Sequence, residues 1–234
     1  MKSFSIILFI TTCALATHAQ KTADEVIAKV IQAKGGMDKL KAIQTLKMQG
    51  IIEFGGGGIK VPLNLYFIHD KIFKQEFTFN GLTGYSIQAR DTGWNFSPFN
   101  GMTSPERATP EDLKQGLNDL DIQSNFIDYA SKGYSIELME PEDVDGVDAI
   151  QLKLNVLPNK TVFYYIDPET WYIIRTKVKG ISNGQEYTNI SNYYNFKATS
   201  AGVVYPYTVD NVTYENIDVN APIDPATFSI AKKK

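Results

Sequence analysis

Hydrophobic residues recur at every second position along much of this chain, and this alternation restricts it to a fold built mainly of β-strands. The clearest case is Thr161–Gly180, TVFYYIDPETWYIIRTKVKG, in which β-branched and aromatic residues flank the turn Asp167–Thr170. Pro168 sets the φ angle that the second turn position needs. Tyr164 and Tyr165 fall on opposite faces, so both faces of this antiparallel hairpin are apolar or aromatic, and we expect packing partners on each side.

The same alternation predicts a meander of further strands. Leu46–Phe54 and Ile59–Phe67 flank the glycine run Gly55–Gly58, which is typical of a flexible hairpin tip. Pro62 lies inside the second of these strands and has no N–H for a ladder, so we expect it at a sheet edge or a bulge. The other predicted strands are Ile72–Phe79, Gly84–Ala89, Tyr134–Met139, Ala149–Val156, Glu186–Lys197 and Val203–Glu215.

Two stretches between these strands are predicted to be irregular. Glu140–Asp148 is rich in acidic residues and turn formers, which predicts a solvated acidic turn. Arg90–Gly101 contains turn residues together with three large aromatics. Because aromatic loops are usually pinned onto a core or line a pocket, we expect one of these two roles for it.

Three helical segments interrupt the strand pattern. Thr22–Glu25 has the spacing of a capping box, and the helix that follows it is predicted to end at Gly35. A short second helix is predicted at Met37–Ile43, and Thr109–Gly133 is predicted to be helical with a break near Gly116. A few helices with about ten antiparallel strands predict an α+β fold with one strongly curved antiparallel sheet.

The first residues predict export. A positively charged start precedes the apolar run Ile6–Ala16, and small residues follow as far as Ala19, so residues 1–19 are interpreted as a signal peptide cleaved after Ala19. This run is too short to span a membrane. Cys13 lies inside it in a poor context for lipidation, which favours a soluble exported protein over an anchored lipoprotein. Residues 20–234 are then expected to form a single domain without cysteine.

Charge and residue types argue against several functions. The mature chain carries 22 Lys and Arg against 26 Asp and Glu, a net charge of −4 without a basic stripe, so nucleic acid is not an expected partner. Its single histidine, His69, favours a surface or turn role over a triad or a zinc ligand. An EF-hand in Glu140–Asp148 would need ligands at Pro141 and Leu152, which cannot supply them. We expect no catalytic residue, metal or cofactor, although a hydrolytic pair of carboxylates stays open because sequence does not reveal their separation.

The unusual feature of the composition is its 13 Tyr and 13 Phe, many of them in strands that are apolar on both faces. Either helices cover one face of a well-packed domain, or an aromatic sheet encloses a cavity for an acyl chain or another apolar ligand. In the central hairpin we favour Tyr164 and Trp171 as cavity residues, with Tyr165 and Tyr172 as the reverse case. The candidate ligand-binding residues are Phe67, Phe77, Phe79, Trp94, Phe96, Tyr164, Trp171 and Phe196.

Four loose motifs follow one another along the mature chain. They are GGMDKL at 35–40, Gly93-Trp94 with Pro98 before a helix, YYIDPET at 164–170, and NAPID at 220–224 followed by Phe228. In this order they resemble the LolA-like outer-membrane lipoprotein-sorting proteins, in the form seen in Bacteroidetes. The similarity spans nearly the whole mature chain.

This resemblance implies an incomplete (half) β-barrel around an apolar cavity, with helices as a lid. It also implies a periplasmic, non-enzymatic carrier for lipoprotein acyl chains or other lipids, with envelope membrane proteins as possible partners. In the family an arginine holds the lid closed, and Arg90, Arg107 and Arg175 are the candidates here. The same fold also serves in envelope interaction and stress sensing, which is the alternative function; a carboxylate-dependent hydrolase ranks after it.

Overall fold

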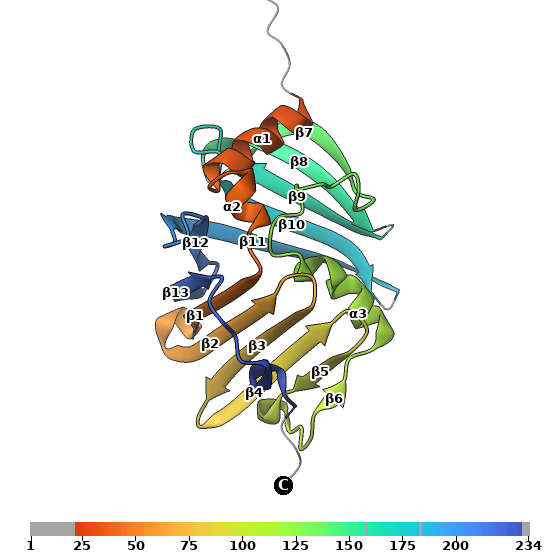
Figure 1. The fold of residues 1–234 in the computed structure, drawn as a ribbon, viewed down its shortest axis with the longest axis vertical. Helices are drawn as coiled ribbons and strands as arrows, with labels where there is room; N and C mark the ends of the chain where they lie inside the picture. The colour runs from red at the N-terminus through yellow and green to blue at the C-terminus, as the bar shows by residue number, and fades with distance from the viewer. Residues whose placement is uncertain (1–21, 158, 183, 231–234) are drawn as a thin grey trace, which may run out of the picture.

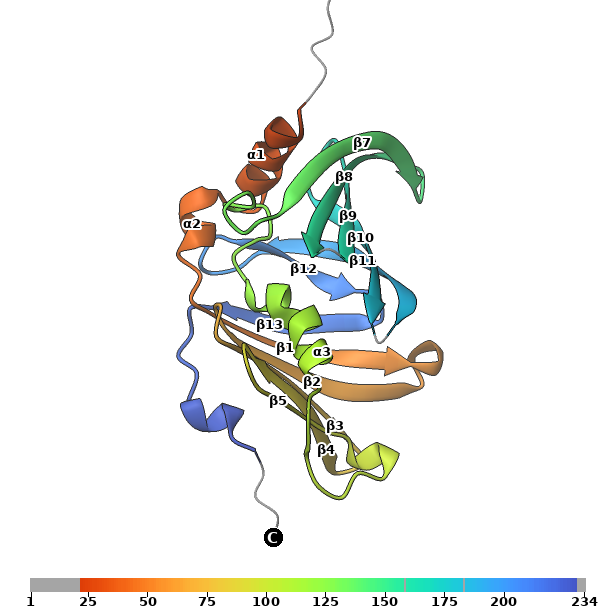
Figure 2. The same ribbon diagram turned by 90° about the vertical axis from the view of Figure 1, so that its right-hand side faces the viewer.

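The computed structural model describes residues 22–157, 159–182 and 184–230. Its main element is a 13-stranded antiparallel sheet with the strand order β6-β5-β4-β3-β2-β1-β13-β12-β11-β10-β9-β8-β7. The end strands β6 and β7 do not pair with each other, so the sheet stays open, and it curves strongly (Figures 1 and 2). The predicted signal peptide, residues 1–19, lies outside the described residues.

The strands are β1 (Thr45–Phe54), β2 (Ile59–Ile68), β3 (Ile72–Phe79), β4 (Leu82–Ala89), β5 (Gly93–Phe96), β6 (Glu106–Arg107), β7 (Ser135–Val144), β8 (Val147–Leu157), β9 (Lys160–Ile166), β10 (Ile173–Ser182), β11 (Gln185–Ala198), β12 (Val204–Val209) and β13 (Val212–Val219). The helices are α1 (Ala23–Ala33), α2 (Met37–Lys41) and α3 (Pro110–Gly116), and the 3-10 turns are η1 (Gly55–Gly57), η2 (Pro98–Asn100), η3 (Leu117–Leu120) and η4 (Pro225–Phe228). In the part of the chain that is described, none of the helices could cross a bilayer.

The predicted central hairpin is confirmed as β9 and β10, which pair antiparallel. Asp167 forms the turn between them, because its carboxylate accepts hydrogen bonds from the Glu169 backbone N–H at 2.8 Å and from the Thr170 hydroxyl at 2.7 Å. Trp171 has a left-handed φ of 61°, which ends the turn, and β10 begins two residues later. The sequence motif therefore encodes the turn through local side-chain bonds.

The two faces of this hairpin differ in what covers them. Tyr164 lies opposite Thr176 on the face toward α1, whereas Tyr165 lies opposite Arg175 on the other face. On that second face the Lys177 ammonium lies 5.2 Å from the centre of the Tyr165 ring and 5.4 Å from that of Phe163. Cations that lie over aromatic rings contribute favourable energy while their charge stays in contact with water. Lysine side chains thus cover part of a face that the sequence presents as aromatic.

The predicted acidic turn is wrong in extent. Most of Glu140–Asp148 is strand: β7 continues to Val144 and β8 begins at Val147. Only Asp145 and Gly146 form the turn, with φ angles of 54° and 89°. A two-residue hairpin turn with positive φ at both positions matches the twist of the strands, and Asp-Gly suits it. The acidic side chains therefore belong to an edge strand, where charge discourages pairing with another chain.

Two further predictions undercounted the strands. The stretch Arg90–Gly101 was expected to be a loop but contains β5 and η2. The single strand expected at Val203–Glu215 is a hairpin of β12 and β13, which turns at Asp210 with a φ of 50°. Both corrections arise because short strands gain their stability from pairing with neighbours rather than from their own composition.

The prediction for Pro62 was an edge or a bulge, and the structure explains how a central strand holds it. Pro62 pairs with Ile51 of β1, but the ladder between β2 and β3 begins only at Leu63. At Pro62 the strand β2 therefore has a neighbour on one side alone. On the side toward β3, where no strand is paired with Pro62, the N–H that proline lacks is not needed for a ladder hydrogen bond.

The predicted helices are present but shorter, and the prediction is wrong for residues 121–133, which form turns rather than helix. The capping box is present, because Thr22 N–H donates to Glu25 Oε2 at 2.8 Å and Glu25 N–H donates to Thr22 Oγ1 at 3.2 Å. Thr109 and Asp112 form a second capping box at α3. The expected break lies at Gly116, where α3 gives way to η3.

The core is largest under α1. Val26 and Val30 are fully buried there against Leu152 and Leu154 of β8 and against Tyr164 of β9. α3 lies inside the curve of the sheet, in contact with both β4 and β10 (Figure 2). These helices leave the face of the β1–β3 region with less cover.

Candidate functional site

A hollow lined almost entirely by apolar side chains lies on β1, β2 and β3. We call it the apolar groove; its volume is about 430 Å³ and it is lined by Ile52, Phe54, Ile59, Val61, Gln75, Phe77, Phe79 and Phe99. Alternation places these strand residues on one face, and η2 adds Phe99, whose ring centre lies 5.4 Å from that of Phe77. Phe54 is 47% exposed and Ile59 is 46% exposed. Exposed apolar patches of this kind mark ligand grooves or interaction sites.

The strand register shows that the face with the apolar groove continues across the sheet to β11. Ile52 of β1 lies opposite Val212, Val212 lies opposite Val209, and Val209 lies opposite Tyr193 of β11. Opposed residues in antiparallel strands point to the same side. The apolar groove and the Tyr193 side chain therefore share the face on which α3 lies.

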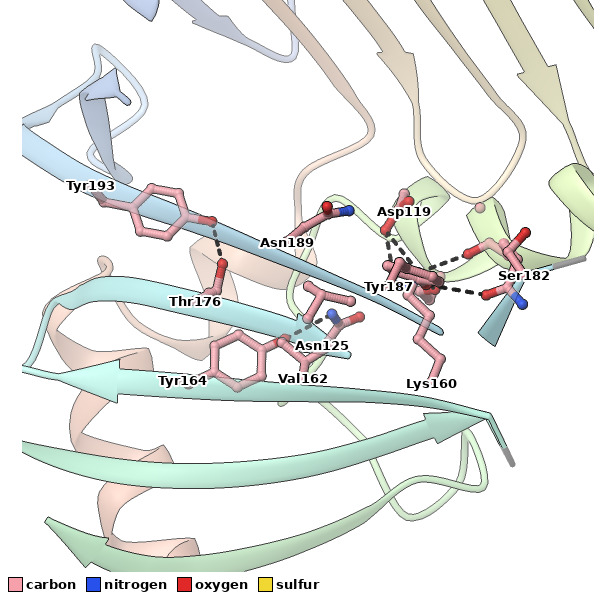
Figure 3. A pocket seen from close by; sticks show the side chains of 14 residues that line it. Asp119, Asn125, Lys160, Val162, Tyr164, Thr176, Ser182, Tyr187, Asn189 and Tyr193 are labelled. Atoms are coloured by element: carbon pink, nitrogen blue, oxygen red, sulfur yellow. Dashed lines mark hydrogen bonds and ion pairs between the residues drawn. The ribbon is translucent and has the colours of Figure 1, made fainter. Parts of the chain in front are cut away.

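A larger hollow, about 550 Å³, lies farther along this face, between β9–β11 and α3 with η3. We call it the polar cavity; Figure 3 shows its wall. Amides, hydroxyls, one lysine and one carboxylate line it: Gln115, Asn118, Asp119, Asn125, Lys160, Tyr164, Thr176, Ser182, Tyr187, Asn189 and Tyr193, together with Gly116, Val162 and Val178. The sequence led us to expect an apolar cavity, whereas this hollow, which is larger than the apolar groove, is polar.

Lys160 is the best-anchored charged side chain in this wall. Its Nζ donates to the carbonyl oxygen of Gln115 and to Oδ1 of Asn118, each at 2.7 Å. The first bond satisfies a carbonyl near the C-terminal end of α3, where cations are favourable. Burial lowers the pKa of Lys160, and Asp119, 3.9 Å away, opposes that shift. The Asp119 side chain is 65% exposed, so solvent screens this pair.

The other groups in the polar cavity are neutral. Asn125 Nδ2 donates to the Tyr164 hydroxyl at 3.0 Å, and the hydroxyls of Thr176 and Tyr193 are 2.9 Å apart. Burial raises the pKa of Tyr164 well above its usual range. Its phenol therefore stays protonated near neutral pH and acts only as a hydrogen-bonding group.

A smaller hollow of about 190 Å³ adjoins the polar cavity and shares Tyr164, Thr176 and Tyr193 with it. We call it the aromatic cavity. Its other lining residues are Lys34, Tyr172, Ile173, Phe196, Val204 and Pro206. The Tyr172 and Phe196 rings stack with their centres 4.5 Å apart.

The structure distributes the eight predicted ligand-binding residues over several places. Phe77 and Phe79 line the apolar groove, and Tyr164 and Phe196 line the aromatic cavity. The remaining four pack elsewhere: Phe67 stacks on Phe73, Trp94 lies under the Arg107 guanidinium, Phe96 contacts Tyr85, and Trp171 packs against the main core. Tyr172, from the reverse case, lines the aromatic cavity together with Tyr164. The eight residues thus do not converge on one pocket.

Sequence reasoning missed Lys34, Lys160 and Phe99 as lining residues. Phe99 lies in the aromatic stretch that we expected to line a pocket or pack on the core, so its neighbourhood gave a usable indication. The sequence around Lys34 and Lys160 gave no indication that they line a cavity, because lysines at the end of a helix or the start of a strand are usually solvated.

The three candidate latch arginines have other partners. Arg90 pairs with Asp70, Arg107 lies over Trp94, and Arg175 donates to Asn192 Oδ1 at 2.5 Å and to an Asp145 carboxylate oxygen at 3.0 Å. Lys160 is the cation that bonds the end of α3.

His69 follows β2, as expected, with its Nδ1 3.8 Å from Asp121 Oδ1. The side chains of the described residues form no metal-binding group of three or more His, Cys, Asp or Glu.

A curved, open antiparallel sheet with hollows on one face defines a half-barrel type of fold. No protein-family model matches this chain, and a search of curated proteins finds no significant match. Among solved structures, a LolA superfamily protein from Nitrosomonas europaea is 13% identical, with a TM-score of 0.55 over 88% of this chain and 97% of that chain.

Two other solved structures are similar to a comparable degree. A DUF1329 family protein from Desulfovibrio piger is 13% identical, with a TM-score of 0.55 over 90% of this chain and 98% of that chain. An outer membrane lipoprotein-sorting protein domain from Vibrio parahaemolyticus is 11% identical, with a TM-score of 0.53 over 86% and 95%. These similarities show that the protein has a LolA-like fold.

Proposed function

We propose that this protein is a non-enzymatic periplasmic carrier that binds an acyl chain of a lipoprotein or another lipid in the apolar groove. The observation that carries the proposal is the groove itself, a hollow of about 430 Å³ in which only Gln75 among the lining residues is polar. Its volume lies in the range of ligand pockets, roughly 300–1,000 Å³. Cleavage after Ala19 would deliver residues 20–234 as the working domain.

The physical basis of binding would be apolar burial. Each methylene group withdrawn from water contributes about 0.8 kcal/mol, and the exposed rings at the rim would be covered at the same time. Phe54 and Ile59, nearly half exposed, lie at this rim. A ligand without polar groups along its chain suits such a wall, because it leaves no hydrogen-bonding group unpaired.

α3 and η3 are the part of the chain that we propose as a lid. They lie inside the curve of the sheet, and Lys160 ties the end of α3 to β9. Loss of those bonds would release α3 from the β9–β11 region and widen the passage along the shared face.

A hydrolase is less well supported by the same residues. Glycoside hydrolysis uses two carboxylates about 5–10 Å apart. Of the described residues that line the polar cavity, Asp119 alone carries a carboxylate, and the apolar groove has none.

The proposal is tested by titrating the purified mature chain with a fluorescent fatty acid. We expect saturable binding, and native mass spectrometry of protein taken from the envelope should show a bound lipid. Phe77→Gln should weaken binding about tenfold or more, since a buried aromatic side chain contributes about 1.5–3 kcal/mol.

Ile190→Gln is the matched control, because Ile190 is 53% exposed and lies opposite Lys177, outside the groove. It should leave the affinity unchanged. Absence of binding by the wild-type protein, or equal losses in the two variants, would overturn the proposal.

A further inference from the structure

Two lysines of the described chain are buried, and each has partners that suit an ammonium group. Lys74 pairs with Glu76 at 2.7 Å and donates to the Thr227 carbonyl at 2.9 Å. Lys160 donates to two oxygens of the Gln115–Asn118 segment. Both satisfy the rule that a cation removed from water needs acceptors.

Lys34 is half-buried and lacks such partners. It caps the C-terminal end of α1, and its backbone is held firmly, since its N–H donates to the Val30 carbonyl at 3.0 Å and its own carbonyl accepts from Val204 at 2.9 Å. Within the described chain its Nζ makes no hydrogen bond or ion pair. Its one close partner is the Tyr205 ring, whose centre lies 5.9 Å from Nζ.

Burial lowers the pKa of Lys34, and only the charge of Asp121 opposes this shift. Asp121 already forms an ion pair with Lys132 and lies near His69. Its carboxylate is therefore engaged elsewhere and does not serve Lys34 as a counter-ion.

We propose that the aromatic cavity is a binding site for a small or medium-chain carboxylic acid, with its carboxylate on Lys34 Nζ and its hydrocarbon body against Tyr172, Phe196 and Pro206. Lys34 is the one charged residue in the described lining of this cavity. The site is separate from the apolar groove and does not depend on lipid binding there.

The size and charge of the cavity select this ligand class. A cavity of about 150 Å³ accommodates benzene, so about 190 Å³ has room for a ring or a short alkyl chain. A longer chain can continue past Tyr164 and Tyr193 into the polar cavity. A phosphate group would call for several cations or N–H donors, whereas one ammonium matches one carboxylate.

The test compares octanoate with octanol, which share a chain length but differ in charge, by isothermal titration calorimetry at neutral pH. Wild-type protein should bind octanoate about tenfold or more tightly than octanol, because hydrogen bonds to charged groups are the strong ones. Lys34→Met should abolish this preference, and Lys34→Arg should retain it.

Lys29→Met is the matched control, because Lys29 is an exposed residue of the same helix and lies outside the cavity lining. It should bind octanoate like the wild type. Thermal unfolding of Lys34→Met should occur at an equal or higher temperature, since an unpaired cation has been removed from an apolar site. Equal binding of octanoate and octanol by the wild type, or unchanged octanoate binding by Lys34→Met, would overturn the proposal.

Discussion

Two regions of the sheet, β7–β10 and β1–β3, use the same alternating pattern but bury it differently. In the β7–β10 region, α1 and the segment around Phe126 and Ile127 fill the face, and Leu152 and Leu154 are completely buried. In the β1–β3 region the equivalent face continues into the apolar groove, whose rim leaves Phe54 and Ile59 nearly half exposed.

The difference teaches that strand composition alone does not distinguish a core from an exposed apolar groove. Both regions carry β-branched and aromatic residues that favour a pleated surface. The two regions differ in the helices that cover them: α1 and α2 lie beside β7–β11, while α3 lies inside the curve of the sheet and contacts β4 and β10 (Figures 1 and 2). The less covered region is the one that carries the apolar groove.

The largest effect on stability is expected from Leu152→Ala in the β7–β10 region. Leu152 is fully buried, so the substitution should destabilise the protein by about 2–5 kcal/mol through lost burial and a residual cavity. Urea denaturation measures it. A loss below about 1 kcal/mol would show that this region is not the better packed of the two.

A smaller effect is expected from Lys160→Met, which removes the bonds to Gln115 and Asn118. Leaving partly buried acceptors unpaired costs about 1–3 kcal/mol. Hydrogen exchange of the α3 amides should speed up, because α3 loses its tie to β9. Lys153→Met, which breaks only a partly exposed pair with Glu137, serves as the control and should cost about 1 kcal/mol or less. Equal exchange in both variants would show that Lys160 does not restrain α3.

Alkaline pH tests the packing of the hydrophobic cluster formed by Leu46, Met48, Leu63, Leu65 and Ile217 in and beside the β1–β3 region. Burial raises the pKa of Tyr214, which packs in that cluster, to about 12 from its usual 10. The folded state then holds the proton of Tyr214 more tightly than the unfolded state. The contribution of this phenol to the free energy of unfolding is therefore complete below pH 10 and is lost as the pH rises toward 12.

The loss should be at most about 3 kcal/mol, because each of the two pKa units corresponds to about 1.4 kcal/mol. Stability measured as a function of pH should fall less steeply across this window in Tyr214→Phe than in the wild type. Parallel curves for the two proteins would show that Tyr214 is not withdrawn from solvent.

The smallest effect on stability, and a large one on binding, is expected from Phe99→Ala in the groove. Phe99 contacts Phe77 and Phe79 but is not fully buried, so unfolding should become easier by only about 1 kcal/mol. Binding of a fluorescent fatty acid should weaken severalfold. If Phe99→Ala lost as much stability as Leu152→Ala and still bound the fatty acid, the result would show that Phe99 belongs to the core and not to a ligand groove.

Local sequence patterns predicted much of the fold and less of the site. The capping box at Thr22, the turn at Asp167 and the glycine tip before β2 depend on contacts within a few residues, and all three were predicted. The strand β5 and the β12–β13 hairpin were missed, because their identity depends on pairing with neighbouring strands. Phe77 and Phe79 share one hollow because both lie on the same face of β3.

The sequence by itself determined the alternation, the helix caps and the tight turns, since these follow from bonds and steric preferences between near neighbours. Only the tertiary structure decided which alternating face became core and which became groove. It also decided that Lys160 reaches Gln115, 45 residues away, and that Lys34 lines the aromatic cavity. Such contacts depend on the order and curvature of the 13 strands. These bring together residues that are distant in the chain, and the local sequence around either residue does not indicate the contact.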